Sequence, residues 1–303
     1  MEILRFFRSI RISGLNEFML LITEFGGEIA FLVTAIIVFW CVDKRQGYFI
    51  MSVGFLGTII SQFMKLWCRI PRPWVEDPDI AMEAAKPDAG GYSFPSGHSQ
   101  SSVGTFGSLA LTTKNRILRW FCIAIAVLVP ISRMYVGVHT PQDVLVGTLI
   151  SLVLIFAVRP FVYSDKKYAM PLLIGIMLLF GILHLCFVML YPFPANVDAE
   201  NLAHGRENAF TMLGCILGMI VVYFVDRRWL DFPTKAVFWA QAIKVAGGLA
   251  LVLLVKSGMK TTLNGLFGEL AGRGVRYFLV VLTAGLIWPL TFRYFSKLGT
   301  GKK

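Results

Sequence analysis

Apolar runs alternate with short polar connectors along almost the whole chain. Most of these runs approach the ~20 residues that a helix needs to cross the hydrocarbon core of a bilayer. The pattern predicts an all-α fold, a polytopic membrane helical bundle of about nine transmembrane helices. The expected spans are 22–42, 48–68, 98–113, 117–138, 142–163, 169–191, 209–225, 236–255 and 275–295.

The first twenty residues differ from these runs, because three arginines (Arg5, Arg8 and Arg11) alternate there with apolar side chains. This pattern is typical of an amphipathic helix that lies in the membrane interface. No short apolar region with a small-residue cleavage site follows, so a removable signal peptide is not expected. Three regions are predicted: an interfacial amphipathic helix at 1–20, a membrane-embedded core at 21–165, and additional transmembrane helices without an assigned role at 166–303.

Composition supports a membrane protein. Hydrophobic residues make up 56% of the 303 residues, charged residues 16%, and the mean hydropathy is +0.68, whereas soluble domains have about 45–50% apolar and about 25% charged residues. The net charge of +11 does not indicate a nucleic-acid partner, because the Lys and Arg residues cluster between apolar runs, where they set topology. The five scattered cysteines have no metal-like spacing, so neither a disulfide framework nor a metal site is predicted.

Charge in the connectors predicts the orientation in the membrane. Alternate connectors are rich in Lys and Arg, which mark cytoplasmic loops, while the opposite connectors, 69–96 and 192–208, are longer and more acidic. The N-terminal helix and the connector around 256–276 are basic and do not follow this alternation. The majority pattern places 69–96 and 192–208 on the extracytoplasmic face of the cell membrane. The basic connectors carry Lys44 and Arg45; Lys114, Arg116 and Arg119; Arg159, Lys166 and Lys167; Arg227, Arg228 and Lys235; and Arg293, Lys297, Lys302 and Lys303.

Three short polar motifs lie at the extracytoplasmic ends of expected spans. The first motif is KLWCRIPRP at 65–73, the second is PSGH at 95–98, and the third is SRMYVGVHTPQD at 132–143. Together they supply three cations, two histidines, one carboxylate and a glycine at a helix start. This inventory suits a phosphate group, because cations and helix N-terminal N–H groups bind its oxygens while imidazoles attack phosphorus and transfer protons.

The third motif contains a helix start, with Thr140 as the N-cap and Pro141 at the first helical position. His139 precedes the cap and Asp143 is the third helical residue, so the carboxylate can hold one imidazole nitrogen and leave the other free to attack. The alternative is that Asp143 only closes a capping box on Thr140. Arg133 is expected near the outer end of the preceding span.

The other two motifs are weaker when taken singly. In the second, Gly97 allows close backbone approach to an anion at a helix start, and His98 is a candidate general acid and base. An ordinary Ser-capped helix with an interfacial histidine is the alternative. In the first, Lys65 ends a span and Arg72 follows it, a pattern that snorkelling side chains also give. The coincidence of three motifs of one chemical kind at one face favours a site.

The three motifs together resemble, without a mismatch, the signature K-x6-R-P, P-S-G-H and S-R-x5-H-x3-D of the type 2 phosphatidic acid phosphatase and vanadium haloperoxidase superfamily. The resemblance covers about residues 48–160, the four-helix catalytic core. It implies that His139 is a nucleophile that forms a phosphohistidine, that Asp143 orients it, and that His98 is the general acid and then the base. It also implies that no metal or other cofactor is needed. The phosphate-binding residues that it implies are Lys65, Arg72, Ser96, Gly97 and Arg133.

The expected function is an integral membrane phosphatase that hydrolyses a lipid phosphomonoester or a lipid pyrophosphate. Phosphatidate, phosphatidylglycerophosphate, polyprenyl pyrophosphate and a sphingoid phosphate are the candidate substrates, and membrane lipids are the other expected partners. The alternatives are a phosphoryl or phospholipid-headgroup transferase of the same superfamily and an anion transporter. Nine spans with an outside N-terminus are similar to the layouts of glucose-6-phosphatase and sphingosine-1-phosphate phosphatase, whereas the apolar spans exclude the soluble haloperoxidases.

A few polar residues lie outside the motifs. Lys244, with Gln241 one turn earlier, lies within an apolar run, where an ionisable residue is a functional candidate by default. Snorkelling, or pairing with Glu28, is the alternative. His184 is expected to be a hydrogen-bonded core residue.

Two further features concern packing and access. Trp74 and Tyr92 flank the motifs and are candidates for an apolar mouth, although interfacial aromatic residues are common in membrane proteins. Gly214 and Gly218 are four residues apart in an apolar run, and this spacing predicts close approach of two helices.

Overall fold

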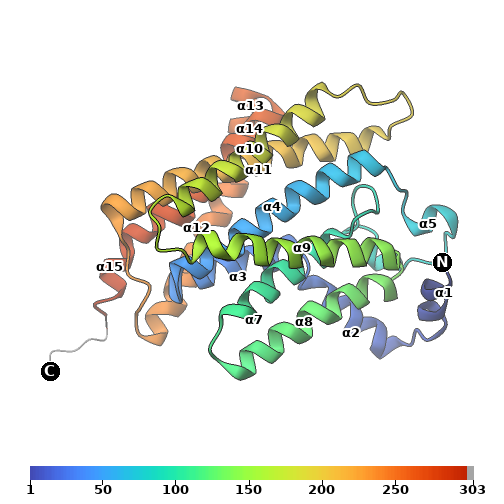
Figure 1. Ribbon diagram of the computed structural model, residues 1–303, viewed down its shortest axis with the longest axis horizontal. Coiled ribbons are helices and arrows are strands. Elements are labelled where there is room, and N and C mark those ends of the chain that lie inside the picture. The colour runs from blue at the N-terminus through green and yellow to red at the C-terminus, as the bar shows by residue number, and fades with distance from the viewer. Residues whose placement is uncertain (299–303) are drawn as a thin grey trace. The chain divides into compact units, whose positions relative to one another are not determined.

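The computed structural model describes residues 1–298, and every regular element in that range is helical. The chain forms two compact units. Unit 1 consists of Met1–Leu32, Phe49–Phe161 and Leu190–Gly205, and unit 2 consists of Val33–Tyr48, Val162–Met189 and the chain from Arg206 onward. The all-α prediction is therefore confirmed for the described residues (Figure 1).

The helices of each unit follow the chain in order. Unit 1 holds α1 (Glu2–Ser9), α2 (Ser13–Glu24), α5 (Pro73–Glu76), η1 (Glu83–Ala85), α6 (Gly97–Ser102), η2 (Val103–Gly107), α7 (Ser108–Thr112) and α8 (Arg116–Tyr135). Five helices contribute residues to both units: α3 (Glu28–Cys41), α4 (Lys44–Cys68), α9 (Pro141–Val162), α10 (Ala169–Leu190) and α11 (Ala199–Val225). Unit 2 also holds η3 (Asp226–Leu230), α12 (Phe238–Gly258), α13 (Lys260–Phe267), α14 (Glu269–Leu282), η4 (Thr283–Ile287), η5 (Trp288–Thr291) and α15 (Phe292–Phe295).

Within residues 1–298, seven helices are long and apolar enough to cross a membrane, and the bent pair α2 and α3 adds an eighth if it counts as one span. These eight match eight of the nine expected runs, so the chain is a multi-pass membrane protein. The remaining expected run, 98–113, is divided among α6, η2 and α7. The seven spans are Lys44–Glu76, Arg116–Tyr135, Pro141–Val162, Ala169–Leu190, Ala199–Leu230, Phe238–Gly258 and Glu269–Phe295.

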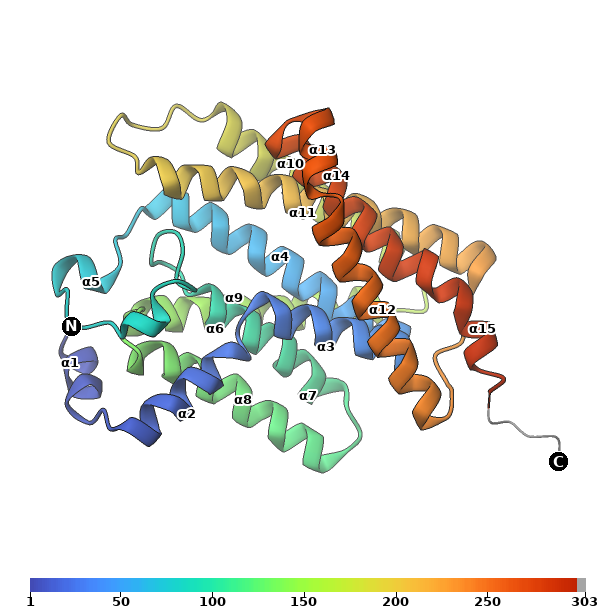
Figure 2. The same cartoon turned by 180° about the vertical axis from the view of Figure 1, so that it is seen from behind.

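Helix α8 is central to unit 1, because α1, α2, α6 and α7 all contact it. Its buried residues Cys122, Ile125 and Val129 recur at helical spacing and face these neighbours. Trp120 and Val127, on the other side, are 69% and 53% exposed. Large exposed apolar side chains at this period are expected where a helix faces lipid rather than water. Figure 2 shows α2, α7 and α8 together from behind.

The N-terminal segment forms two helices, which corrects the prediction of one amphipathic helix over residues 1–20. The break falls between α1 and α2, where Arg11 donates to the carbonyls of Ile80 (2.7 Å) and Tyr135 (2.7 Å). Burial of the Arg11 guanidinium lowers its pKa. Leu4 is fully buried in an apolar cluster that includes Ile80 and Tyr135. These contacts anchor the segment to the end of α8, so it belongs to the compact fold of unit 1.

The two basic segments that disagree with the charge alternation both pair with acidic connectors. Arg5 lies 3.3 Å from Asp77, and Arg8 lies 3.6 Å from Asp79, both in the connector 69–96. In unit 2, Arg273 lies 2.9 Å from Glu207. Carboxylates therefore compensate these arginines locally, which weakens them as topological signals.

Unit 2 contains the close helix pair that the two glycines predict. A side chain at Gly214 would overlap the backbone of Gly274 in α14, and one at Gly218 would lie 2.8 Å from Val281. Small residues at these positions let the backbones of α11 and α14 approach, as the spacing predicted. The packing interpretation of this motif is confirmed.

Candidate active site

Two cations of the first motif, Lys65 and Arg72, are held by one short loop of unit 1. Lys65, in the last turn of α4, donates to the carbonyl of Tyr92. Arg72 donates from Nε to the carbonyl of Gly91 (2.9 Å) and from Nη2 to that of Gly90 (2.7 Å). The Lys65 and Arg72 side chains are only 5% and 7% exposed. Three consecutive carbonyls at 90–92 therefore orient two buried cations.

The third motif turns the chain so that its histidine returns toward the end of α8. Gly137 has φ +79. Its N–H donates to the carbonyl of Met134 (3.0 Å), and the N–H of Val138 donates to the carbonyl of Arg133 (3.2 Å). This is the Schellman arrangement, which needs a left-handed residue just past a helix end, and glycine adopts that conformation without a steric penalty. A side chain at Gly137 would also overlap the carbonyl of Ile80. The glycine explains how Arg133 and His139 come to adjoin one site.

Arg133 is fully buried and only partly satisfied. Its Nη1 donates to the hydroxyl of Thr23 on α2 (2.7 Å). Its Nε and Nη2 atoms have no hydrogen-bond partner among residues 1–298. Buried polar groups normally have partners, and a buried charge without one is costly. Two inward donors on one guanidinium are therefore suited to the oxygens of an anion.

Asp143 combines the two roles that the sequence left as alternatives. Its Oδ2 accepts from the N–H of Thr140 (2.7 Å), and the N–H of Asp143 donates to the Thr140 hydroxyl (3.3 Å), which completes a capping box. The same Oδ2 accepts from the hydroxyl of Ser93 (2.6 Å) and lies 3.4 Å from Nδ1 of His139. Capping fixes the carboxylate in the position from which it faces the imidazole.

The tautomer of His139 follows from its neighbours. Nε2 lies 2.8 Å from Nη1 of Arg72, and a guanidinium can only donate, so Nε2 carries the lone pair and the ring proton is on Nδ1, facing Asp143. The imidazole is 2% exposed. Burial first, and then the charge of Arg72, holds its pKa well below the ordinary value of 6.5. The imidazole is therefore neutral at physiological pH.

The second motif starts a helical stretch that runs through α6, η2 and α7. Ser96 is the N-cap, and its hydroxyl accepts from the N–H of Ser99 (3.3 Å), while its own N–H donates to the carbonyl of Asp143 (3.0 Å). A side chain at Gly97 would meet nothing within 4 Å. His98 is half-buried, and its imidazole makes no hydrogen bond to the described residues.

The structure thus brings the predicted residues together within unit 1, to different degrees. Arg72, His139 and Asp143 are in direct contact, and Ser96 joins them through the backbone of Asp143. Lys65, Arg133 and His98 lie close enough for their charges to lower the pKa of His139. Gly97 leaves open space at the start of the helix that carries His98.

The sequence interpretation missed two side chains that hold the predicted residues. Ser93, which is fully buried, holds Asp143, and Thr23 on α2 holds Arg133. The only signal for Ser93 is its place two residues before the second motif. Thr23 lies in an apolar run far from any motif, so the sequence contains no signal for it.

Part of the additional region also lies beside this site. Residues 190–205 belong to unit 1, and the N–H of Asp198 donates to the hydroxyl of Tyr92 (3.2 Å). A side chain at Gly91 would lie 3.7 Å from His204 and 3.8 Å from Lys65. Trp74, the other candidate for the mouth, lies 5.6 Å from the Arg72 guanidinium. Residues 190–205 therefore lie beside the loop that holds Lys65 and Arg72.

Lys244 and His184 are both buried within unit 2. The ammonium group of Lys244 donates to the carbonyls of Trp40 (3.0 Å) and Thr234 (3.2 Å) and lies 4.1 Å from the Phe292 ring centroid. These two hydrogen bonds and the ring contact stabilise the buried ammonium group within unit 2. His184 is 2% exposed, but neither ring nitrogen has a partner among the described residues, so the expected hydrogen bond is not present.

Comparison with known proteins agrees with this geometry. Residues 45–167 match the PAP2 superfamily, and residues 210–301 match the transmembrane extension of PAP2 superfamily phosphatases. The chain is 30% identical over 173 residues to phosphatidylglycerophosphatase B of Bacillus subtilis, an alignment that covers 52% of this chain and 81% of that protein. The chain belongs to the PAP2 superfamily. The family and the phosphatase class expected from the three motifs are confirmed.

Other PAP2 relatives differ in how much of the chain they match. Undecaprenyl-diphosphatase BcrC of Bacillus subtilis is 29% identical over 50% of this chain and 80% of its own length. Sphingosine-1-phosphate phosphatase 1 of Mus musculus is 25% identical over 78% of this chain and 58% of its own length. No solved structure matches the chain.

Proposed function

We propose that this PAP2 phosphatase hydrolyses a lipid phosphomonoester, or the terminal phosphate of a lipid pyrophosphate, through a covalent phosphohistidine on His139. One observation carries the proposal: the Nε2 lone pair of a buried neutral imidazole lies beside Arg72, in a unit where Arg133 has two donors without partners. A nucleophile beside cations that lack an anion is the arrangement needed for phosphoryl transfer.

The phosphate would be bound by side chains of all three motifs. Lys65, Arg72 and Arg133 neutralise its charge, and guanidinium groups bind two oxygens at once. The N–H groups at the start of the helix that begins with Gly97, capped by Ser96, add backbone donors without a side chain in the way. Arg72 Nη1 donates to the lone pair of Nε2, so this hydrogen bond would pass to a phosphate oxygen when the substrate binds and would free Nε2 to attack.

The reaction would proceed in two displacements. Nε2 of His139 attacks phosphorus and the bond to the lipid oxygen breaks. His98, which the negative charge of the bound phosphate would hold as an imidazolium, gives its proton to the leaving alkoxide or phosphate. Asp143 stabilises the cationic ring by accepting from Nδ1–H. His98, now neutral, takes a proton from water, the water oxygen attacks phosphorus, and the bond to Nε2 breaks. Inorganic phosphate leaves and both imidazoles return to their starting state.

A lipid substrate is supported by the position of the site and by the relatives. The three motifs lie at the ends of membrane helices, where a headgroup can enter while its tails stay in hydrocarbon. The names of the relatives state substrates with lipid tails: phosphatidylglycerophosphate, undecaprenyl diphosphate and sphingosine 1-phosphate. Residues 190–205, which lie beside Tyr92 and Lys65 in unit 1, would contact the part of the headgroup beyond the phosphate and so contribute to selectivity.

We infer that the site faces the extracytoplasmic side of the cell membrane. Counting the stretch α6 to α7 as one more crossing beside the eight candidate spans would put the N-terminus outside and the C-terminus inside. The exposed apolar side chains of Ile3 and Phe6 suit α1 to the interface on the outer side. The pairing of Arg5 and Arg8 with Asp77 and Asp79 supports the same side for α1 and the connector 69–96.

The test is phosphate release by purified protein in detergent, with a chelator present. The panel contains phosphatidate, phosphatidylglycerophosphate, a polyprenyl pyrophosphate, a sphingoid phosphate and, as a soluble comparison, glucose 6-phosphate. We expect turnover of at least one lipid and loss of turnover in His139→Ala with substrate binding retained. Full activity of His139→Ala would refute the mechanism. Binding without phosphate release by the unaltered protein would favour a transporter, and release only with an added alcohol acceptor would favour a transferase.

A further inference from the structure

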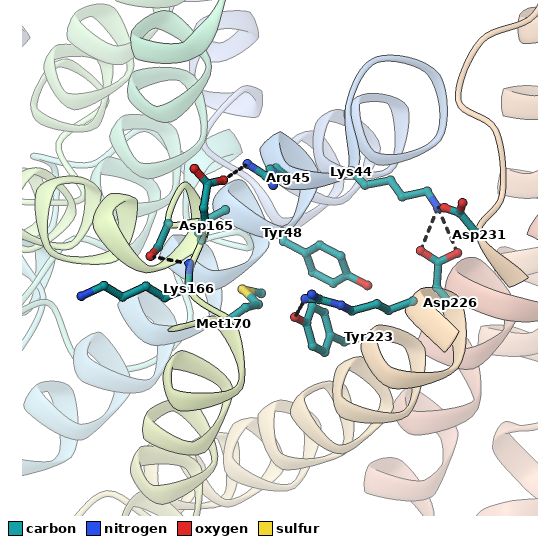
Figure 3. Close-up of a pocket in the computed structure, with 12 residues that line it drawn as sticks. Lys44, Arg45, Tyr48, Asp165, Lys166, Met170, Tyr223, Asp226 and Asp231 are labelled. Atoms are coloured by element: carbon teal, nitrogen blue, oxygen red, sulfur yellow. Dashed lines mark hydrogen bonds and ion pairs between the residues drawn. The ribbon is translucent and has the colours of Figure 1, made fainter. Parts of the chain in front are cut away.

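A second polar cavity lies entirely within unit 2 and shares no residue with the active site. It has a volume of about 450 Å³ and is lined by the start of α4, the residues around 162–170, and the end of α11 with η3. Figure 3 shows the Tyr48 ring between two charged groups: the Arg45 and Asp165 pair on one side, and Lys44 with Asp226 and Asp231 on the other.

The carboxylates of this cavity are already paired. Lys44 lies 2.9 Å from Asp226 and 3.2 Å from Asp231, and Arg45 lies 3.7 Å from Asp165. Asp226 is further occupied by the N–H of Phe232 (3.2 Å), so its oxygens face donors of the fold. These ion pairs leave the cavity no carboxylate that lacks a cation.

Two cations of the cavity have no carboxylate partner among residues 1–298. Arg227 donates from Nη1 to the hydroxyl of Tyr223 (2.6 Å), which leaves the rest of its fork of donors available. The ammonium group of Lys166 lies 5.9 Å from the centroid of the Tyr168 ring. The lining therefore offers positive charge and N–H donors to a ligand, and no negative charge beyond that already paired.

Tyr48 supplies an independent sign of a ligand. Its residue is 6% exposed, yet its hydroxyl has no hydrogen-bond partner in the described part of the chain. The ring is held edge-on by Phe39 and Tyr223, with centroids 5.1 Å and 5.7 Å away, so it is packed in place. A buried hydroxyl normally finds a partner, and Tyr48 is one of the residues that line the cavity.

The position of the cavity narrows the ligand class. Its cations come from three of the basic connectors, those at 44–45, 166–167 and 227–228, which charge alternation assigns to the cytoplasmic face. Basic pockets between transmembrane helices at that face bind phospholipid headgroups. We propose that this cavity binds the phosphate of an anionic phospholipid headgroup, with the Arg227 guanidinium and the Tyr48 hydroxyl as donors. The shared chemistry is a phosphate group, which a soluble phosphate would also present.

The test measures binding to full-length protein in detergent with three probes: dioctanoyl phosphatidylglycerol, inorganic phosphate and dioctanoyl phosphatidylcholine. The first is a phosphodiester, so the proposed phosphatase reaction does not consume it. Arg227→Gln removes the free guanidinium, and Tyr48→Phe removes only the hydroxyl while it keeps the packed ring. Arg228→Gln is the matched control, because Arg228 is the neighbouring exposed arginine and does not line the cavity. Size-exclusion profiles confirm that each variant is folded.

We expect Arg227→Gln to weaken phosphatidylglycerol binding about tenfold or more and Tyr48→Phe to weaken it by a smaller factor, since lost hydrogen bonds to a charged group have this size. The affinity of Arg228→Gln for phosphatidylglycerol should be within about twofold of that of the unaltered protein, because an exposed surface charge contributes little. Phosphatidylcholine should bind the unaltered protein more weakly than phosphatidylglycerol does. The same Arg227 dependence with inorganic phosphate alone, and not with the lipid, would assign the site to a soluble phosphate. Equal binding by Arg227→Gln and Arg228→Gln for every probe would overturn the proposal, whatever the outcome of the phosphatase assay.

Discussion

Thr23→Val tests whether a residue outside the motifs holds the phosphate-binding guanidinium. The substitution keeps the size and branching of the side chain and removes the hydroxyl that accepts from Arg133 at 2.7 Å. Arg133 would then keep its buried charge with no hydrogen bond to the described residues, since Nε and Nη2 already lack partners. The change therefore removes the one contact that orients this guanidinium.

A hydrogen bond to a charged group contributes about 1.5–3 kcal/mol, which corresponds to about 10- to 150-fold in an equilibrium or rate constant. We expect kcat/KM for the lipid phosphate to fall by about tenfold or more in Thr23→Val. The melting temperature should fall by a few degrees, because a buried cation loses its partner. Saturating inorganic phosphate should reverse much of that fall, because it supplies the acceptors that the hydroxyl supplied.

The assay compares three variants in detergent by steady-state kinetics and by thermal melting with and without phosphate. Thr23→Ser keeps a hydroxyl and should recover activity to within a few fold. Thr105→Val is the matched control, because Thr105 is 1% exposed and its hydroxyl has no partner among residues 1–298, so its loss should be close to neutral. If Thr23→Val and Thr105→Val give the same kcat/KM, Thr23 does not position Arg133 and this reasoning is wrong.

Three further predictions concern the carboxylate, the nucleophile and the helix packing. Ser93→Ala removes the 2.6 Å hydrogen bond to Asp143 and should lower the free energy of unfolding by about 1.5–3 kcal/mol in a thermal melting assay. Ser108→Ala is the control and should be nearly neutral, because the buried Ser108 hydroxyl has no partner among the described residues. Because the pKa of His139 is lowered in the folded state, the unfolded chain takes up a proton below about pH 6.5 that the folded chain does not, so stability should be lost as pH falls through that range, and less in His139→Gln. Gly214→Ala should lower the melting temperature by forcing α11 from α14, whereas Gly175→Ala, where a side chain meets nothing within 4 Å, should not; equal melting would contradict the close approach.

The motifs could be found in the sequence because their chemistry lies in side chains at fixed spacing. Thr140 and Pro141 predict a helix start. Because the helix begins there, Asp143 lies one turn from the backbone of His139. The two interpretations of Asp143 looked exclusive from sequence, but one carboxylate oxygen serves both the cap and the imidazole. Membrane helices were equally predictable, because length and apolarity decide them.

What could not be predicted depends on backbone groups and on long-range contacts. The carbonyls of residues 90–92 hold Lys65 and Arg72, and any residue type supplies a carbonyl. The amphipathic pattern of residues 1–20 continues through the break at Arg11, so periodicity contains no sign that the side chain turns inward onto two carbonyls. The connector at 190–205 joins unit 1 although it follows α10 in the chain, and only the three-dimensional fold reveals that it lies beside Tyr92 and Lys65.

The central claim is that Nε2 of His139 becomes covalently bound to phosphorus during turnover. The direct measurement is rapid quench under alkaline conditions with lipid substrate labelled with ³²P in the reacting phosphate, followed by peptide mapping. The account predicts transient, acid-labile label on the peptide that contains His139, absent from His139→Ala and accumulating in His98→Ala supplied with an activated leaving group. Turnover at full rate with no protein-bound label at any quench time would contradict it and would favour direct attack by water.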